Sequence, residues 1–279
     1  MFSHITSAIN DIRRGKMVIV VDDSIRENEG DLVMAARFIT PKKVNFMLQE
    51  ARGLLCVPMT RERAKLLNLW PIVPDELNTE YTKCKFMVSV DKVVLEKERL
   101  SPNSQYKTGV SANARAQTIL ALAMENIAAT DFTRPGHITP LVAEDFGVLT
   151  REGHTEATVD LIKLASINPP VGTLVEILKP DGTIGRLPYL QRFAKHHHLT
   201  MICVRDLVAY RKYHEKLVNR VARAKLPTPY GDFTIYAYEE VITGKGHIAL
   251  LMGKVTDRSP TLVRVHSRCL TGDVFSSMR

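Results

Sequence analysis

Short apolar runs alternate with amphipathic stretches in the first part of the chain. Residues 2–14 repeat apolar positions at helical spacing, and Gly15 follows them as a helix end. Thr40 and Pro41 supply a cap and a first helical residue, which predicts a helix running to about Arg52. Three apolar runs, each too short for a helix, predict buried strands at residues 17–22, 31–36 and 54–59.

The same two periods continue through the middle of the chain. Residues 113–129 and 156–165 have helical spacing, whereas residues 173–178 form a strand-like run. A Pro-Asp-Gly turn follows that run, so residues 183–188 are predicted to be its hairpin partner. Because helices and strands are interspersed without a regular crossover pattern, we expect an α+β fold with a mixed sheet flanked by helices.

The pattern changes toward the C-terminus. Residues 205–225 have the pattern of one strongly basic helix, which Pro227 and Pro229 would end. Strand-like runs then occupy residues 230–238 and 247–255, within only 52 residues beyond Pro227, which are few for an independent core. We therefore expect three parts: a folded domain over 1–213, a basic linker over 214–227, and a small, incomplete β-rich segment over 228–279.

Composition and charge narrow the class of protein. With 279 residues, of which 45% are hydrophobic and 24% charged, the chain is long and apolar enough for a folded core. The net charge is +8, but residues 1–185 carry −1 and residues 186–279 carry +9. A basic excess suggests an anionic partner, and here it lies in the last third of the chain.

The cysteines and the N-terminus predict the cellular setting. Four widely spaced cysteines, Cys56, Cys84, Cys203 and Cys269, form no CxxC pair, so neither a disulfide framework nor a zinc knuckle is expected. The first residues have the pattern of an amphipathic helix rather than a signal peptide, and no apolar run reaches the length of a membrane span. We expect a cytoplasmic protein without a membrane partner.

The most highly charged segment, Asp22 to Asp31, links two predicted strands and holds five carboxylates within ten residues. Such carboxylates repel one another unless cations join them. Mg²⁺ takes oxygen ligands and keeps several waters, so one or two carboxylates would suffice. Arg26 offers a planar fork suited to phosphate or carboxylate. The alternative is a solvated acidic turn without a ligand.

Residues 151–156, Arg-Glu-Gly-His-Thr-Glu, come directly before a predicted helix. Backbone N–H groups at a helix N-terminus, with a nearby Arg and a Thr hydroxyl, can form a phosphate cradle. His154 could add a nitrogen ligand for a metal. The alternative is that Thr155 only caps the helix and that His154 has no ligand role.

Two further residues could move protons. His137 ends an Arg-Pro-Gly-His segment with the pattern of a rigid turn, although a turn histidine can also be merely exposed. Glu176 lies within an apolar strand, where it is either a buried carboxylate with a raised pKa or a solvent-facing residue. The run of histidines at 196–198 is predicted to cap the C-terminus of a helix.

The order and spacing of these motifs resemble the 3,4-dihydroxy-2-butanone 4-phosphate synthase family over residues 5–213. The resemblance rests on DDSIRENEGD, LLCV, TGVSA, RPGH, REGHTEA and RDLVAYR. It implies a carbon–carbon lyase of riboflavin biosynthesis that converts D-ribulose 5-phosphate into 3,4-dihydroxy-2-butanone 4-phosphate and formate. It also implies two Mg²⁺ ions, with Mn²⁺ as the alternative, and a homodimer whose sites take residues from both subunits.

The resemblance implies roles for individual residues. Glu27 and His154 would hold the metal ions, and His137 and Glu176 would act as catalytic acid/base residues. The substrate-binding residues would be Arg26, Glu27, Asp31, Cys56, Thr108, Arg151, Glu152, Gly153, His154 and Thr155.

Some positions depart from the family pattern. Ala114 stands in place of an Asp and Lys107 in place of a Thr, and residues 84–87 read Cys-Lys-Phe-Met instead of Thr-Gly/Ala-Phe-Thr. Glu152 adds a negative charge to the proposed phosphate loop. A diverged paralogue that acts on another sugar phosphate is therefore an alternative.

Residues 230–279 resemble the start of the GTP cyclohydrolase II family, most specifically in RVHSRCLTGDVF. Cys269 would be the first zinc ligand, and Arg268 replaces the usual Glu. The chain stops at Arg279, where further ligands would follow, and one thiolate cannot build a three-ligand zinc site. We therefore do not expect GTP cyclohydrolase II activity. A non-catalytic nucleotide-binding or regulatory role is a further alternative, whereas nucleic acid is not expected as a partner.

Overall fold

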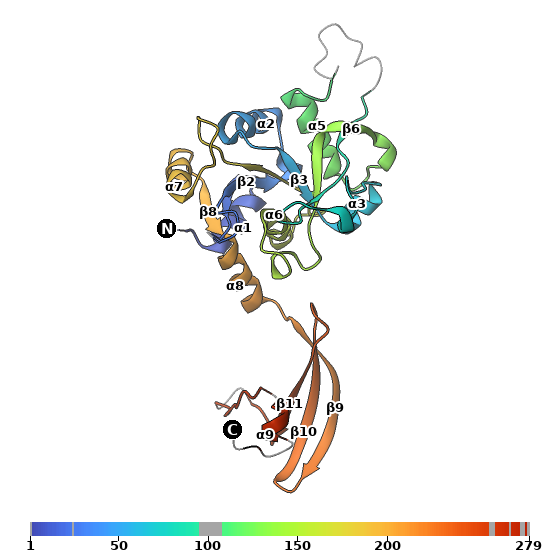
Figure 1. Cartoon of the computed structure of the whole chain (residues 1–279), viewed down its shortest axis with the longest axis vertical. Helices are drawn as coiled ribbons and strands as arrows, with labels where there is room; N and C mark the ends of the chain where they lie inside the picture. Colours follow the sequence, from blue (N-terminus) through green and yellow to red (C-terminus); the bar gives the residue numbers. More distant parts are fainter. Residues whose placement is uncertain are drawn as a thin grey trace. The chain divides into compact units, whose positions relative to one another are not determined.

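The computed structural model describes residues 2–23, 25–94, 108–256, 260–267, 269–273 and 277. The chain divides into two compact units, Met1–Glu215 and Lys216–Arg279 (Figure 1). Three positions noted in the sequence, Lys107, Arg268 and Arg279, lie outside the described residues. Among the helices of the described part, none is long and apolar enough to cross a membrane.

A mixed sheet forms the centre of the first unit. Its strands are hydrogen-bonded in the order β4-β6-β3-β7-β2-β1-β8, and β5 also pairs with β6. β3 and β6, and likewise β1 and β8, run parallel, whereas the other pairs are antiparallel. The strands are β1 (Val18–Val21), β2 (Gly30–Ala35), β3 (Cys56–Met59), β4 (Lys85–Phe86), β5 (Val90–Lys92), β6 (Phe132–Val142), β7 (Gly172–Glu176) and β8 (Thr200–Cys203).

Helices cover both faces of this sheet (Figure 1). α1, α6 and α8 pack against one face, and α2, α5 and α7 pack against the other. The helices are α1 (Ile5–Arg13), α2 (Pro41–Phe46), α3 (Arg61–Leu66), α5 (Ala112–Leu122), α6 (His154–Leu164), α7 (Leu187–His196) and α8 (Val204–His214). The continuous apolar runs predicted as strands are therefore buried on both sides, and the α+β prediction is confirmed.

The helix predicted from Thr40 begins as expected, because the Thr40 hydroxyl accepts a hydrogen bond from the Lys43 N–H at 3.3 Å. It continues into a π-helical turn, Met47–Ala51. The helix predicted over 113–129 is shorter than expected and ends at Leu122. Arg63, which is buried, donates to the Leu122 carbonyl at 3.0 Å and to the Met124 carbonyl, and so satisfies the end of the helix.

Two local predictions about turns need correction. The hairpin expected at residues 173–188 is present but short. Leu178 and Ile184 form one antiparallel bridge, the Lys179 N–H donates to the Thr183 carbonyl at 2.7 Å, and Leu187 already begins α7. The segment ending at His137 is not a turn but part of β6, since β5 pairs with it there. The predicted C-terminal position of the histidine run is confirmed, because α7 ends at His196.

The second unit contains a separate antiparallel sheet in the order β11-β10-β9, formed by β9 (Val218–Thr228), β10 (Gly231–Glu240) and β11 (Gly246–Met252), and a short helix α9 (Leu270–Asp273). The predicted basic helix over 205–225 is wrong beyond His214, and most of the expected linker lies in β9. The reason is cross-strand pairing with β10, in which Arg220 and Arg223 lie over the Tyr236 ring at 5.5 and 5.6 Å.

Candidate active site

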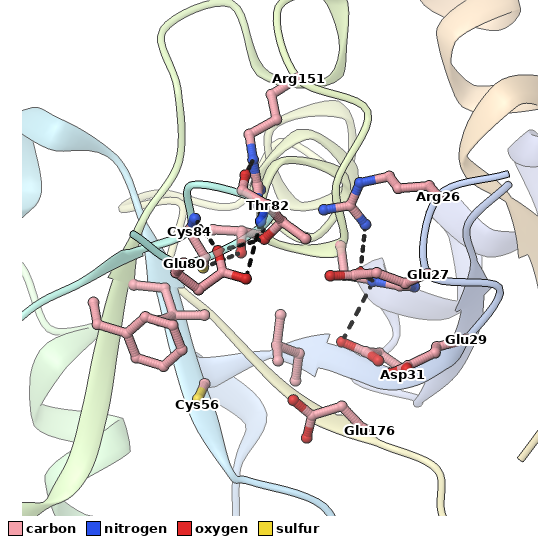
Figure 2. A pocket seen from close by; sticks show the side chains of 15 residues that line it. Arg26, Glu27, Glu29, Asp31, Cys56, Glu80, Thr82, Cys84, Arg151 and Glu176 are labelled. Carbon is pink, nitrogen blue, oxygen red and sulfur yellow. Dashed lines mark hydrogen bonds and ion pairs between the residues drawn. The ribbon is translucent and has the colours of Figure 1, made fainter. Parts of the chain in front are cut away.

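A small pocket opens on the face of the sheet that α6 covers (Figure 2). Its volume is ≈ 190 Å³, below the roughly 300–1,000 Å³ typical of drug-sized sites, so it suits a small substrate. Eight of the predicted site residues line it: Arg26, Glu27, Asp31, Cys56, Arg151, His154, Thr155 and Glu176. These residues come from positions more than 140 residues apart in the chain.

Strand register explains how three of these residues meet. Asp31 on β2 is the direct partner of Glu176 on β7, and Cys56 on β3 is the partner of Leu174. Side chains alternate between the two faces of a sheet, so Glu176 and Leu174 share one face. The Glu176 carboxylate also accepts a hydrogen bond from the Leu54 N–H at 2.7 Å, which holds it at the edge of the pocket.

The acidic turn between β1 and β2 is ordered by its own side chains. Oδ1 of Asp22 accepts from the Glu29 N–H at 2.8 Å, and Oδ2 accepts from the Glu27 N–H at 3.0 Å. The Arg26 guanidinium donates to Oδ2 of Asp22 at 2.9 Å and pairs with Glu27. Asp22 and Asp31 are buried, so a fully solvated acidic turn is not what the structure shows.

His154 and the carboxylates form the electrostatic centre of the pocket. The hydrogen bond from His154, together with Arg26, lowers the pKa of Glu27 to about 2. Burial raises the pKa of Asp31. Burial would lower the pKa of His154, but Asp31, Glu27 and Asp22 together raise it to about 9. The imidazole is thus held as a cation among acids.

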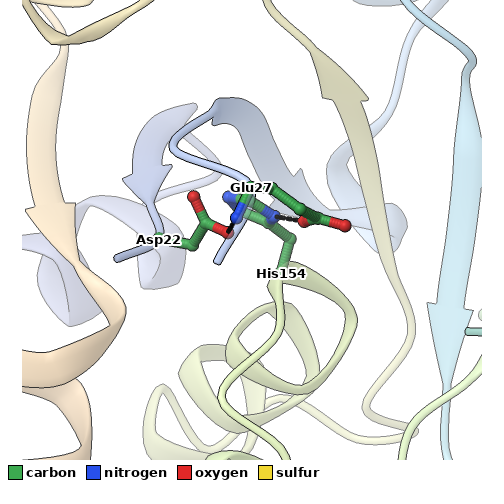
Figure 3. Close-up of side chains that lie close together, drawn as sticks. All are labelled: Asp22, Glu27 and His154. Carbon is green, nitrogen blue, oxygen red and sulfur yellow. Dashed lines mark hydrogen bonds and ion pairs between the residues drawn. The ribbon is translucent and has the colours of Figure 1, made fainter. Parts of the chain in front are cut away.

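The same residues fit a divalent cation. Ligand atoms of Asp22, Glu27 and His154 all lie within 4.8 Å of one another (Figure 3). Within the described part of the chain, Oδ1 of Asp31 and Nε2 of His154 are buried and have no hydrogen-bond partner. Buried polar atoms are nearly always partnered, so these two atoms point to a ligand. Two carboxylates and one imidazole are a donor set that Mg²⁺ or Mn²⁺ accepts.

The N-terminus of α6 supplies the basic side of the pocket. Gly153 is the N-cap of α6 and no side chain caps it, so the reading of Thr155 as a mere cap is wrong. Arg151 donates to Oε2 of Glu156 at 2.6 Å. A Cβ at Gly153 would come within 2.4 Å of the Arg151 guanidinium, so a glycine is needed for this side chain to lie there.

The loop that precedes β4 contacts Arg151 through Thr82. The guanidinium donates to the carbonyl of Thr82 at 2.9 Å and to its hydroxyl at 2.8 Å. Glu80 accepts hydrogen bonds from Thr82 and from the Cys84 N–H at 2.8 Å, which holds the loop in shape. The Cys84 sulfur lies 3.7 Å from the Thr155 hydroxyl. Burial raises the pKa of both pocket thiols, Cys56 and Cys84, so both are inert neutral groups.

Four predicted site residues do not line this pocket. Glu152 and Thr108 are exposed, and Gly153 is packed behind Arg151. His137 lies on β6 with its side chain 42% exposed, and its Nδ1 is 2.6 Å from Oδ2 of Asp91. Of these four, Glu152 and Gly153 directly precede the lining residue His154 in the chain, whereas His137 and Thr108 are far in sequence from any lining residue of the α6 N-terminus.

Sequence reasoning missed several residues of the site. Asp22 and Glu29 belong to the acidic segment proposed to bind a cation, but neither was predicted individually as a site residue. Arg186, which follows the Asp-Gly turn, donates to the backbone carbonyls of Glu27 and Asn28 and so fixes the acidic turn. Glu80 and Thr82 had no sequence signal, because their place depends on a loop that folds back onto Arg151.

Comparison with known proteins identifies the family. Residues 6–210 match the model of 3,4-dihydroxy-2-butanone 4-phosphate synthase, and residues 219–279 match that of GTP cyclohydrolase II. The first match covers most of the chain, so the chain belongs to the 3,4-dihydroxy-2-butanone 4-phosphate synthase family. This finding confirms the resemblance to the synthase family predicted from the sequence. It also confirms the predicted resemblance of the C-terminal residues to part of GTP cyclohydrolase II.

Relatives named as riboflavin biosynthesis proteins match along the whole chain. The riboflavin biosynthesis protein RibBA of Aquifex aeolicus is 50% identical over 278 residues, which are 100% of this chain and 66% of that protein. The bifunctional riboflavin biosynthesis protein RIBA 1, chloroplastic, of Arabidopsis thaliana is 46% identical over 278 residues, which are 49% of its length. The chain thus spans about two thirds of the bacterial relative and about half of the plant relative.

Solved structures agree with the fold. RibBX, a two-domain 3,4-dihydroxy-2-butanone 4-phosphate synthase from A. baumannii, superimposes with a TM-score of 0.76 at 41% identity, covering 90% of this chain and 70% of that one. A 3,4-dihydroxy-2-butanone 4-phosphate synthase in complex with two magnesium ions gives 0.68 at 33% identity, covering 76% of this chain and 98% of that one.

Proposed function

We propose that the chain converts D-ribulose 5-phosphate into 3,4-dihydroxy-2-butanone 4-phosphate and formate, as a carbon–carbon lyase of riboflavin biosynthesis. The observation that carries this proposal is one small pocket with two chemically different sides. One side is the N-terminus of α6 with Arg151, which suits a phosphate group. The other side is the carboxylate cluster around Glu27 and Asp31, which suits a polyhydroxylated carbon chain and a metal ion.

The metal in this proposal is Mg²⁺, with Mn²⁺ as the alternative, and the neighbour with two magnesium ions supports a two-ion site. Glu27 and His154 would hold the ions, and Asp22 lies close enough to contribute. A divalent cation bound there supplies Lewis-acid stabilisation of negative charge on substrate oxygens. His154 would bind it as a neutral imidazole, so metal binding must displace a proton.

The protein's own groups bind and orient the substrate in this proposal. The backbone N–H groups at the start of α6 and the Thr155 hydroxyl bind the phosphate, and Arg151 supplies a positive charge beside it. Arg26 and Asp31 contact the sugar hydroxyls. Cys56 forms a neutral, apolar wall.

Glu176 is the acid/base residue that this pocket itself contains. Its carboxylate is fixed by the Leu54 N–H and sits beside Asp31, so it can accept a proton from a substrate carbon or hydroxyl and return it. The second proposed acid/base residue, His137, is absent from the lining of the pocket. We propose that a second copy of the chain supplies His137 and Thr108, which makes the active form a homodimer.

The proposal is tested by following the products. With MgCl₂ and ¹³C-labelled D-ribulose 5-phosphate, we expect formate and the four-carbon phosphate to appear in equal amounts in NMR spectra. Release of formate without the four-carbon product, or no turnover by correctly folded protein, would contradict the proposal.

A diverged substrate is a second candidate, because Cys84 lines the pocket where the family usually has threonine. A thiol is a weaker hydrogen-bond donor and acceptor than a hydroxyl, so a substrate hydroxyl would be recognised less strongly there. Turnover of related pentose and hexose phosphates, compared with that of ribulose 5-phosphate, separates the two candidates. The absence of GTP cyclohydrolase II activity and the cytoplasmic location stay predictions.

A further inference from the structure

Asp91 holds His137 through two hydrogen bonds. Oδ1 of Asp91 accepts from the backbone N–H of His137 at 2.9 Å, and Oδ2 lies 2.6 Å from the imidazole Nδ1. A carboxylate can only accept hydrogen bonds, so Nδ1 carries the hydrogen of this contact. One carboxylate therefore fixes both the main chain and the ring of a residue 46 positions away in the chain.

The surrounding backbone is built to admit this carboxylate. Asp91 lies in β5, and its pairing with β6 is irregular between Val90 and Asp91. A Cβ added at Gly109 would lie 2.0 Å from Oδ2 and 2.2 Å from Cγ of Asp91. Only a glycine lets the chain pass so close to the carboxylate. Asp91 is thus packed between His137 and the segment that carries Thr108.

We propose that Asp91 is a positioning residue that sets the ring orientation and tautomer of His137. With the hydrogen held on Nδ1, a neutral imidazole presents Nε2 as the atom that accepts and returns a proton. This inference rests on the proposed function only in treating His137 as an acid/base residue. The arrangement has the logic of a base oriented by a carboxylate, as in hydrolytic triads.

The contact with Gly109 extends the proposal to Thr108. Because the Asp91 carboxylate touches His137 on one side and the Gly109 position on the other, it sets the spacing between the imidazole and the Thr108 segment. His137 and Thr108, which are both exposed and do not line the pocket, are thereby held as one preformed group.

The direct test measures the tautomer of His137 and needs no turnover. Protein with ¹⁵N-labelled histidine is compared with its His137→Gln variant to assign the His137 signals. We expect the neutral ring to be protonated on Nδ1 in the wild-type protein and to become a mixture of tautomers in Asp91→Ala. A wild-type ring protonated mainly on Nε2, or a tautomer unchanged in Asp91→Ala, would overturn the inference even if the enzyme is active.

The kinetic test compares variants of the full chain with D-ribulose 5-phosphate. We expect Asp91→Asn to lower kcat about 100-fold, the order of one acid/base contribution, with KM changed less than about threefold. Gly109→Ala, which displaces the carboxylate without removing it, is expected to lower kcat about tenfold, again through the acid/base step. Asp181→Asn, at an exposed turn position, is the matched control and should behave as wild type.

The two tests separate this inference from the proposed function. If the wild-type chain shows no turnover but the tautomer shift occurs, the function is wrong and the positioning role stands. If turnover occurs and Asp91→Asn keeps kcat within threefold of wild type with an unchanged circular dichroism spectrum, the positioning role is wrong.

Discussion

Nδ1 of His154 lies 3.5 Å from Oε2 of Glu27 and 4.0 Å from Oδ2 of Asp31, at the start of a helix and opposite the acidic turn. In this arrangement the imidazolium compensates the buried carboxylates around it, which is why its pKa is raised. A divalent cation bound there would also compensate the negative charge of these carboxylates, and it carries twice the charge of an imidazolium. Asp22, Glu27 and His154 already lie close enough together to be its ligands. Several measurable consequences depend on this one relationship.

The first consequence is stabilisation by metal. Because a cation relieves repulsion among Glu27, Asp31 and Asp22, we expect MgCl₂ to raise the melting temperature and EDTA to lower it. At a Mg²⁺ concentration of 100 times Kd, the gain in free energy of unfolding is about 2.7 kcal/mol. Glu27→Gln should lose most of this gain in thermal scans, whereas Glu62→Gln, at an exposed position on α3, should keep it.

The second consequence is a pH dependence of the metal-free protein. The pKa of His154 is about 9 in the folded protein and 6.5 in an unfolded chain. The positive charge of His154 therefore stabilises the fold fully below about pH 6.5, and this stabilisation is lost as the pH rises through about 9. In EDTA, urea unfolding of the wild type should therefore show falling stability across this window. His154→Gln should be less stable at pH 6 and nearly flat across it. His214→Gln, at an exposed position, should retain the wild-type slope.

The third prediction concerns phosphate recognition. Arg151 makes charge-assisted contacts with Glu156 and Thr82 that a lysine cannot reproduce with one ammonium group. Arg151→Lys is expected to raise KM for the sugar phosphate by about 10- to 100-fold, with a smaller effect on kcat. The change in KM corresponds to the loss of one hydrogen bond to a charged group, about 1.5–3 kcal/mol. Arg61→Lys, at a surface ion pair, should leave KM unchanged. An unchanged KM in Arg151→Lys would argue against a phosphate at this end of the pocket.

The fourth prediction tests whether one site uses two subunits. His137→Ala and Glu176→Gln should each be inactive alone. If His137 acts in the partner's pocket, co-expressed subunits should form mixed dimers in which one of two sites is intact. Random pairing then restores about one quarter of wild-type activity. A mixture that stays as inactive as its components would show that both residues serve the same subunit's site.

Much of the first unit could be predicted because its signals are local. The apolar runs of β1 and β2 are short and continuous, and every residue in them is buried. Because a strand that is buried on both faces needs no polar face, its sequence is an uninterrupted apolar run that is easily recognised. The capped start of α2 at Thr40 is equally local. Where contacts distant in sequence decide, the predictions were wrong. The basic residues of β9 resemble those of the preceding helix α8 and so predict that the helix continues. The pairing of β9 with β10 instead determines its conformation.

The candidate site divides in the same way. The two charged motifs stand out in the sequence, and the family resemblance assigned Glu27 and His154 within them as metal ligands. The structure brings these two side chains together. Thr82 and Glu80 were not predicted, because neither lies in a motif. Thr82 is held by hydrogen bonds from Arg151, 69 residues away, and Glu80 accepts hydrogen bonds from Thr82 and Cys84. Asp91, 46 residues from His137, was missed for the same reason, since it is a single carboxylate in an ordinary strand.

The most direct test of the whole account is formate release from D-ribulose 5-phosphate by the full chain, with MgCl₂ or with EDTA, for wild type, Glu27→Gln and Glu62→Gln. We predict release with Mg²⁺ for wild type and Glu62→Gln, loss of release in EDTA, and at least about a 100-fold lower rate for Glu27→Gln, as expected when groups that stabilise developing charge are removed. Formate release that survives both EDTA and Glu27→Gln would contradict the account.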